Sequence, residues 1–249
     1  MLRNTEKYYS LNFNKVKRSK NEIKFIIIHY TGMANELKAL DRLTNIQSEV
    51  SSHYFIKENG KILELVPNLY TAWHAGKSKW GKHKNLNKNS IGIEISNPGH
   101  QLNYKKFSNN QIKSLVLILK YLVKKYKINS KNILGHSDIA PARKKDPGEK
   151  FPWELLSKKK LCVWHKLKEK NLKKLRRVKT NKIEKRKFFK NVKDIGYSST
   201  NKMAVIQAFQ RRFRQNLING IVDQECLQIS NSLLYFHIFL ELKFNLSIF

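Results

Sequence analysis

The sequence predicts an α/β fold, in which a central mixed β-sheet is flanked by helices and followed by a small all-α module of three helices. Three observations support this class. Short apolar runs rich in β-branched residues recur along the chain, segments with helical spacing lie between them, and the composition changes after Leu156. With 249 residues, 41% of them hydrophobic, the chain is long enough for one ordinary domain and a smaller one beside it.

Short apolar segments predict the strands. Residues 24–32 (KFIIIHYTG) form a β-branched run closed by glycine, and residues 131–138 (KNILGHSD) form another. Residues 51–67 predict two strands joined by a Glu-Asn-Gly turn, which is a hairpin signal. In residues 90–97 (SIGIEISN) isoleucines alternate with a glycine and Glu94. The isoleucines are therefore expected on one face of a strand and Glu94 on the other.

Helical spacing predicts the helices. Residues 36–48 place apolar side chains three residues apart, and residues 108–126 form a long helical segment with Ser108 as its N-cap. Towards the C-terminus, Val205, Phe209 and Phe213 are spaced by four residues, so they share one face of a helix. The final apolar stretch is interrupted by charged residues and is interpreted as a core helix rather than a membrane anchor.

The charge distribution is strongly basic. The formal net charge is +32, which predicts attraction to polyanions, although a Lys-, Asn- and Ile-rich composition also accounts for it. Residues 158–190 hold sixteen Lys or Arg and only two acids. This run predicts a linker with some helix, with a patch for an anionic partner as the alternative. The two cysteines lie far apart in the sequence, outside CxxC spacing, and are expected to be free thiols.

Three potential metal ligands stand at the ends of predicted strands or just after them. His29 closes the first strand, His136 follows the glycine that closes another, and Asp146 lies ten residues further on in a loop bounded by proline and glycine. Imidazole and carboxylate are ligands that zinc accepts, and three of them leave a fourth position for water, which is the catalytic pattern. The alternative for each histidine alone is a structural role.

Hydrolysis at such a site also requires a base and a cation. Glu94 lies on the polar face of an apolar strand, where an acid is costly unless it is employed, and its alternative is a buried salt bridge. Lys144 stands two residues before Asp146 and could point into the same site. Its alternative is one more surface lysine, which is the interpretation given to its neighbour Lys145.

Five blocks of sequence together resemble a known family. They are IIIHYTG, SSHYFI, AWHAG, SIGIEISN and GHSDIAPARKKDPGEKFPW. In this order and spacing they resemble the zinc-dependent N-acetylmuramoyl-L-alanine amidases, relatives of phage amidase-lysozymes and peptidoglycan recognition proteins. A shorter block in residues 195–223 resembles the three-helix peptidoglycan-binding module often fused to these enzymes. The implied organisation is an N-terminal extension (1–19), a zinc amidase catalytic domain (20–156), a basic linker (157–187) and a peptidoglycan-binding-like helical domain (188–249).

The resemblance implies a role for each candidate residue. One zinc ion would be held by His29, His136 and Asp146, with Glu94 as general base and Lys144 as the cation that stabilises the oxyanion. Further residues of the blocks would surround the site: Trp73 and His74 would line the substrate cleft, Arg143 would meet the carboxylates or sugar of the substrate, and His53 and Asp138 would have supporting roles.

The implied reaction is hydrolysis of the amide bond between N-acetylmuramic acid, in the wall or in its 1,6-anhydro form, and L-alanine of the stem peptide. The alternative is a non-catalytic peptidoglycan-binding protein. No motif for specific nucleic-acid binding, no membrane-spanning segment and no signal of oligomeric state is visible. The first twenty residues lack the apolar core of a signal peptide, which favours the cytoplasm, whereas the binding module favours the periplasm or the cell wall.

Overall fold

The structure is a computed structural model that describes residues 5–246, with side chains described to residue 235. The strands are β1 (Thr5–Lys7), β2 (Phe13–Asn14), β3 (Phe25–Tyr30), β4 (Tyr54–Ile56), β5 (Ile62–Glu64), β6 (Thr71–Ala72), β7 (Lys79–Trp80), β8 (His83–Lys84), β9 (Ser90–Ile95) and β10 (Ile133–Gly135). The helices are α1 (Glu36–Thr44), α2 (Asn109–Tyr126), α3 (His136–Ile139), α4 (Trp153–Lys158), α5 (Glu169–Leu175), α6 (Lys182–Ile195), α7 (Lys202–Phe213) and α8 (Gln224–Leu246).

Among these residues, six strands form one mixed sheet in the order β1-β5-β4-β9-β3-β10. The central strands β4, β9, β3 and β10 are mutually parallel, and β5 joins them as the antiparallel partner of β4, which confirms the predicted hairpin. In the pairing of β3 with β9, Ile28 lies opposite Ile93 and His29 lies opposite Glu94. The predicted mixed sheet flanked by helices is therefore confirmed.

The two faces of the sheet are covered differently. Alternate isoleucines of β3 and β9 pack against α2, a helix that begins as predicted after Ser108, whose hydroxyl accepts a hydrogen bond from the Gln111 amide. On the opposite face, α1 covers Phe55 and its neighbours, while helices α6 and α7 join Phe25 and Ile27 in a separate cluster. The second face is therefore covered by α1 at one side and by α6 and α7 at the other. The polar residues of β3 and β9 lie between these two groups of helices.

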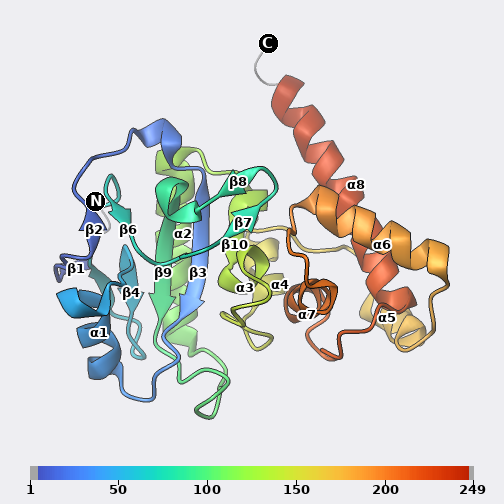
Figure 1. The fold of residues 1–249 in the computed structure, drawn as a ribbon, viewed down its shortest axis with the longest axis horizontal. Coiled ribbons are helices and arrows are strands. Elements are labelled where there is room, and N and C mark those ends of the chain that lie inside the picture. The colour runs from blue at the N-terminus through green and yellow to red at the C-terminus, as the bar shows by residue number, and fades with distance from the viewer. Residues whose placement is uncertain (1–4, 247–249) are drawn as a thin grey trace.

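The C-terminal helices lie beyond the β10 edge of the sheet (Figure 1). Val205, Phe209 and Phe213 of α7 are buried along the predicted face, and Phe188 of α6 packs against Phe209. Because this cluster also contains residues of β3 and β10, the helical region and the sheet share one core. No helix in the described part of the chain is both long and apolar enough to cross a membrane.

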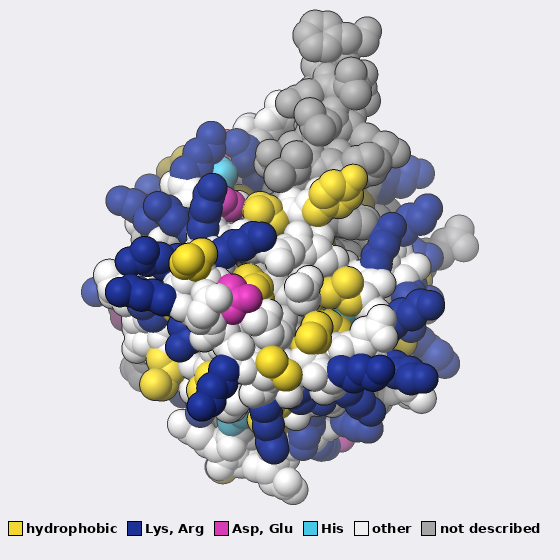
Figure 2. Space-filling view, turned by 90° about the vertical axis from the view of Figure 1, so that its right-hand side faces the viewer, with side chains coloured by type: hydrophobic (Ala, Val, Ile, Leu, Met, Phe, Trp, Pro, Cys, Tyr) yellow, Lys and Arg dark blue, Asp and Glu magenta, His cyan; other side chains and the backbone are white. Residues whose placement is uncertain are grey.

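The segment predicted as a basic linker, 157–187, is more ordered than its composition suggests. It contains α5, and Leu161 and Leu172 are buried within it. Arg176 pairs with Glu225 of α8 at 2.7 Å. The basic side chains stay on the outside, where Figure 2 shows them around the face of the helical region. A few apolar residues spaced among many lysines are therefore enough to pack the segment against the rest of the protein. Its boundaries as a separate linker stay a prediction.

A buried ion pair ties α7 to the turn that follows β10. Strand β10 ends at Gly135, the glycine predicted to close it, and His136 begins the short helix α3. Asp138 in this helix accepts hydrogen bonds from the Gly135 amide and the Tyr197 hydroxyl, and it pairs with Arg212 of α7. Both charged side chains are almost fully buried, so each depends on the other for compensation.

We therefore expect Arg212→Met to lower the free energy of unfolding by about 3–5 kcal/mol, because it leaves the Asp138 carboxylate buried without its counter-charge. Denaturant titration followed by circular dichroism measures the change. Arg186→Met, at an exposed position on α6, is the matched control and should stay within about 0.5 kcal/mol of the parent. Equal effects of the two substitutions would show that the buried pair is not required.

Candidate metal centre

A cleft of about 470 Å³ opens at the carboxyl ends of β3 and β9, on the face of the sheet opposite α2. One wall comes from α1 and the segment that follows it, including Leu43 and Val50, and the other from the loop 143–146. His74, Glu94, His136 and Asp146 line its floor. Because adjacent parallel strands end at the same edge, their terminal polar residues are brought together there.

Three ligand-type side chains converge at one point, and two of them, His136 and Asp146, line this cleft. The Nδ1 atoms of His29 and His136 lie 2.9 Å apart, and each lies 3.1 Å from the same Asp146 oxygen, Oδ2. The three side chains are buried, with residue exposures of 1%, 3% and 6% respectively. The structure therefore brings together all three residues that the sequence analysis singled out as metal ligands.

Hydrogen bonds behind the two imidazoles orient their rings. His136 Nε2 lies 3.1 Å from the carbonyl of Ala75, which accepts from it in the tautomer that leaves Nδ1 free, and 3.3 Å from Arg143 Nη2. His29 Nε2 lies 3.1 Å from His74 Nδ1, and His74 Nε2 lies 3.3 Å from the Ser90 hydroxyl. Since Ser90 donates to the Leu86 carbonyl, its oxygen accepts from His74, and His74 Nδ1 in turn accepts from His29. Both histidines direct Nδ1 towards the Asp146 carboxylate.

His74 approaches the backbone of β9 closely. A Cβ at position 92 would overlap the His74 ring, so glycine is required there for the ring to lie behind His29. His53, on the other side of His74, accepts the Gly92 N–H at 3.0 Å. The family resemblance implies that His74 lines the substrate cleft. It does line the cleft, but its nitrogens are engaged with His29 and Ser90.

Glu94 is the buried acid of the cleft. Its Oε2 atom has no hydrogen-bond partner among the described residues. Burial, followed by the nearby Asp146 charge, raises the pKa of Glu94 to about 8, whereas Lys144 acts to lower it. The alternative of a satisfied buried salt bridge does not hold for this carboxyl, which is held in the cleft with one oxygen unpaired.

The cationic residues of the loop 143–146 differ in placement. Lys144 is half-buried and close enough to influence the pKa values of both Glu94 and His29, whereas Lys145 is exposed. Arg143 is anchored, because its Nη2 donates to the carbonyls of Ala75 at 2.8 Å and Lys77 at 3.1 Å. All three line the cleft. Trp73 also lines it, and its indole N–H donates to Asn14 Oδ1 at 2.7 Å.

The structure adds a hydrogen-bonded group that the sequence analysis missed. The Tyr30 hydroxyl lies 2.8 Å from His100 Nδ1, and His100 Nε2 lies 2.9 Å from Glu149. Tyr104 stacks on the His100 ring at 4.4 Å and donates to the Pro147 carbonyl. Tyr30 and His100 line the cleft, and the group holds the loop that carries Asp146. The signal available in the sequence was the position of His100 in the loop directly after a strand that ends at the cleft.

A mixed sheet that presents two histidines, an aspartate and a buried glutamate in one cleft is an arrangement typical of metal-dependent hydrolases. The match to the N-acetylmuramoyl-L-alanine amidase family (Amidase_2) extends over residues 19–149, just over half of the chain. The chain belongs to this family, which confirms the resemblance seen in its five sequence blocks.

Similar proteins extend the match beyond this segment. The chain is 36% identical over 230 residues to the N-acetylmuramoyl-L-alanine amidase AmiD of Escherichia coli, covering 85% of this chain and 82% of that protein. It is 39% identical to the 1,6-anhydro-N-acetylmuramyl-L-alanine amidase AmpD of Haemophilus influenzae, covering 43% of this chain and 57% of that protein. The match to AmiD therefore includes the C-terminal helices as well as the sheet.

Two solved structures are similar in fold. A complex of E. coli AmiD with anhydro-N-acetylmuramic acid-L-Ala-D-γ-Glu-L-Lys has a TM-score of 0.77 and 33% identity, covering 89% of this chain and 92% of that one. The AmpDh3 structure from Pseudomonas aeruginosa in complex with anhydromuramic pentapeptide has a TM-score of 0.75 and 27% identity, covering 88% and 93%. The arrangement of the sheet and the helical region is thus shared with both.

Proposed function

We propose that the chain is a zinc-dependent amidase that hydrolyses the bond between 1,6-anhydro-N-acetylmuramic acid and L-alanine of a stem peptide. The observation that carries this proposal is the convergence of His29, His136 and Asp146 beside the unpaired carboxyl of Glu94, in a chain of the amidase family. The anhydro form is supported by the relatives, whose names or bound ligands contain it.

The three ligand atoms fit a zinc ion. They lie 2.9–3.1 Å from one another, close to the roughly 3.3 Å that separates ligands of a tetrahedral zinc with bonds of about 2.0–2.1 Å. With Nε2 as the protonated nitrogen of each ring, both Nδ1 lone pairs and the Asp146 carboxylate form a donor set that zinc accepts. Three buried acceptors facing one another repel unless a cation lies between them, and burial next to His136 lowers the pKa of His29 to about 4, which keeps it neutral.

When bound, zinc supplies a Lewis acid for the scissile carbonyl and lowers the pKa of a water molecule. Glu94 accepts a proton from the attacking water as the new C–O bond forms. It returns this proton to the nitrogen of L-alanine as the C–N bond breaks, so the products are a carboxylic acid on the sugar and a peptide with a free amine.

Lys144 and the outer residues of the cleft have separate tasks in this proposal. Lys144 donates to the carbonyl oxygen, where negative charge develops during attack. Arg143 and Trp73 contact the sugar or the peptide along the cleft. His74 holds the His29 ring from behind and so acts as a positioning residue. The non-catalytic alternative is disfavoured because the ligands, the base and the cation are all in place. The cellular compartment stays a prediction, which cell fractionation tests.

Glu94→Gln should lower kcat by about 10²–10⁴-fold, because an amide cannot accept the proton of the attacking water. Release of peptide from anhydro-muropeptide, followed by mass spectrometry, measures the rate, and zinc content confirms that the site is intact. Glu154→Gln, which changes an exposed glutamate on α4, is the matched control. Peptide release by Glu94→Gln at the control rate would exclude Glu94 as the base.

The neighbouring lysines provide a matched pair for the cation. Lys144→Met should lower kcat by about 10²–10³-fold, because it removes the donor to the developing oxyanion. Lys145→Met changes an exposed lysine of the same loop and should stay within about twofold of the parent. The same assay measures both, and comparable losses in the two variants would contradict the assignment of Lys144.

Chelation should abolish peptide release, and one equivalent of zinc per chain should restore it. Zinc affinity, measured by competition with a chromophoric chelator, should fall by about 10–100-fold in His74→Ala, because the hydrogen bond that fixes His29 is lost. His83→Ala, at a histidine outside the cleft, should leave the affinity unchanged. Full activity in the chelated protein would show that the three-ligand site is not a zinc site.

A further inference from the structure

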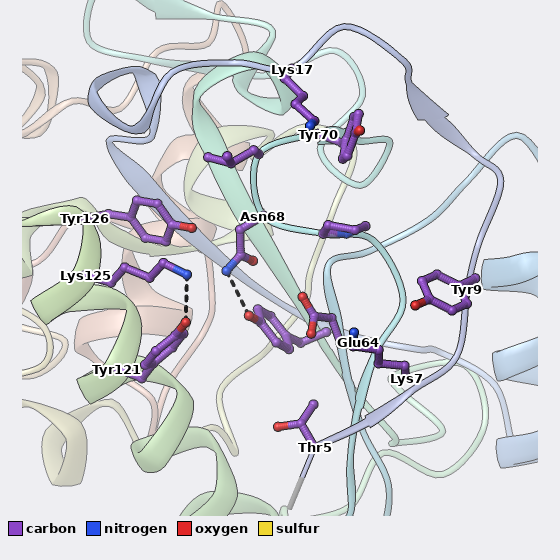
Figure 3. Close-up of a pocket in the computed structure, with 13 residues that line it drawn as sticks. Thr5, Lys7, Tyr9, Lys17, Glu64, Asn68, Tyr70, Tyr121, Lys125 and Tyr126 are labelled. Carbon is purple, nitrogen blue, oxygen red and sulfur yellow. Dashed lines mark hydrogen bonds between the residues drawn. The ribbon is translucent and has the colours of Figure 1, made fainter. Parts of the chain in front are cut away.

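A second pocket, of about 440 Å³, lies on the α2 face of the sheet, opposite the metal centre (Figure 3). Tyr121, Lys125 and Tyr126 reach it from the last turns of α2. The other wall consists of the N-terminal segment that includes Lys7 and Tyr9 and of the stretch 67–70 after β5. Its volume lies within the range of about 300–1,000 Å³ typical of small-ligand sites.

The pocket floor is held firmly. The Arg18 guanidinium, which is almost fully buried, donates to the Asn68 carbonyl through Nε and Nη2. Its Nη1 donates to the carbonyls of Asn87 and Lys88, at 2.9 and 3.1 Å. The stretch that carries Asn68 is thus tied to the segment before β9, so its side chains are pre-positioned rather than free to turn away.

The floor presents polar groups without protein partners. Asn68 is only 7% exposed, and its Nδ2 donates to the Tyr54 hydroxyl at 2.9 Å, while its Oδ1 has no partner among the described residues. Glu64 also lines the pocket and is half-buried, and burial raises the pKa of its carboxyl. No ion pair or side-chain hydrogen bond reaches Glu64 within the described part of the chain, and Lys7 and Lys125 act on it only through space. Glu64 and Asn68 therefore both line the pocket with an acceptor oxygen that no described protein group pairs with.

Aromatic rings and lysines surround these acceptors. Tyrosine rings line the pocket from several segments, and their negative faces suit a cation: Tyr9, Tyr54, Tyr70, Tyr121 and Tyr126. Lys125 already lies over the rings of Tyr121 and Tyr126 and donates to the Tyr121 hydroxyl at 2.7 Å. Three lysines face one acid in the lining, so the pocket as a whole is positive. A ligand must then carry more negative than positive charge.

We propose that this pocket binds a short acidic peptide through its free amino terminus, with the ammonium group on Glu64 and Asn68 and at least two carboxylates on Lys7, Lys17 and Lys125. This inference rests on the proposed function for the identity of the peptide. Amide hydrolysis frees the nitrogen of L-alanine as an ammonium group, whereas in the substrate the same nitrogen is an uncharged amide. The pocket would therefore distinguish the released peptide from the intact muropeptide.

The dipeptide L-Ala-D-Glu tests the proposal, because it carries one ammonium and two carboxylates. Calorimetric titration of the zinc-loaded full chain should detect binding, and hydrogen exchange should slow in residues 67–70 and 121–126. Glu64→Gln should weaken this binding at least tenfold, and Lys125→Met should weaken it as well. N-acetyl-L-Ala-D-Glu, in which the ammonium is blocked, should give no protection there. Glu154→Gln is the matched control and should bind as the parent does.

Protection confined to the cleft around residues 143–146 would overturn the proposal, as would equal binding of the acetylated peptide or undiminished binding by Glu64→Gln. Hydrolysis of anhydro-muropeptide is measured on the same preparation. Hydrolysis without protection at the second pocket means that the inference fails alone. A different result would separate the two proposals the other way. If L-Ala-D-Glu protects the second pocket, the acetylated peptide does not, Glu64→Gln loses the protection and no muropeptide is hydrolysed, the proposed function fails while the peptide site stands.

Discussion

The parallel pairing of β3 with β9 places His29 directly opposite Glu94, and the rest of the cleft is arranged around that pair. A slip of one residue in either strand would turn an isoleucine towards the cleft and a polar group into the core. The register is set by the isoleucines on the other face, which are fully buried against α2. The free energy gained by burying apolar surface on one side of the sheet therefore offsets the free energy lost when an imidazole and a carboxyl are desolvated on the other.

Hydrogen bonds that end at backbone carbonyls orient the two histidine rings of the candidate metal centre. Behind His136 the chain of contacts ends after one step, at the carbonyl of Ala75. Behind His29 it runs through His74 and Ser90 to the carbonyl of Leu86. Each ends at a backbone carbonyl, which can only accept a hydrogen bond and so favours the tautomers that leave Nδ1 free. The absence of a side chain at Gly92 is what allows His74 to take this place.

The helical region contributes to the site through the turn that carries His136. The buried pair of Asp138 and Arg212 links that turn to α7, and Tyr197 adds a hydrogen bond from the segment between α6 and α7. A helical region with these contacts is part of the support of the metal centre, in addition to any role in binding the wall. The two pockets lie on opposite faces of the same sheet, so a ligand in one can be held without obstructing the other.

Local patterns in the sequence were sufficient for strands β3, β4, β5, β9 and β10, for α2 with its Ser108 cap and for the three ligand candidates, because these depend on periodicity and on positions near strand ends. Other features joined residues far apart in the chain: the place of His74 behind His29, the group of Tyr30, His100 and Glu149, and the seating of the basic segment on α8. By itself the sequence determined the class of fold and singled out the candidate metal ligands and the buried glutamate beside them. Only the tertiary structure decided which neighbours orient and pair with them, because such contacts follow from strand order, register and packing, which no local pattern records.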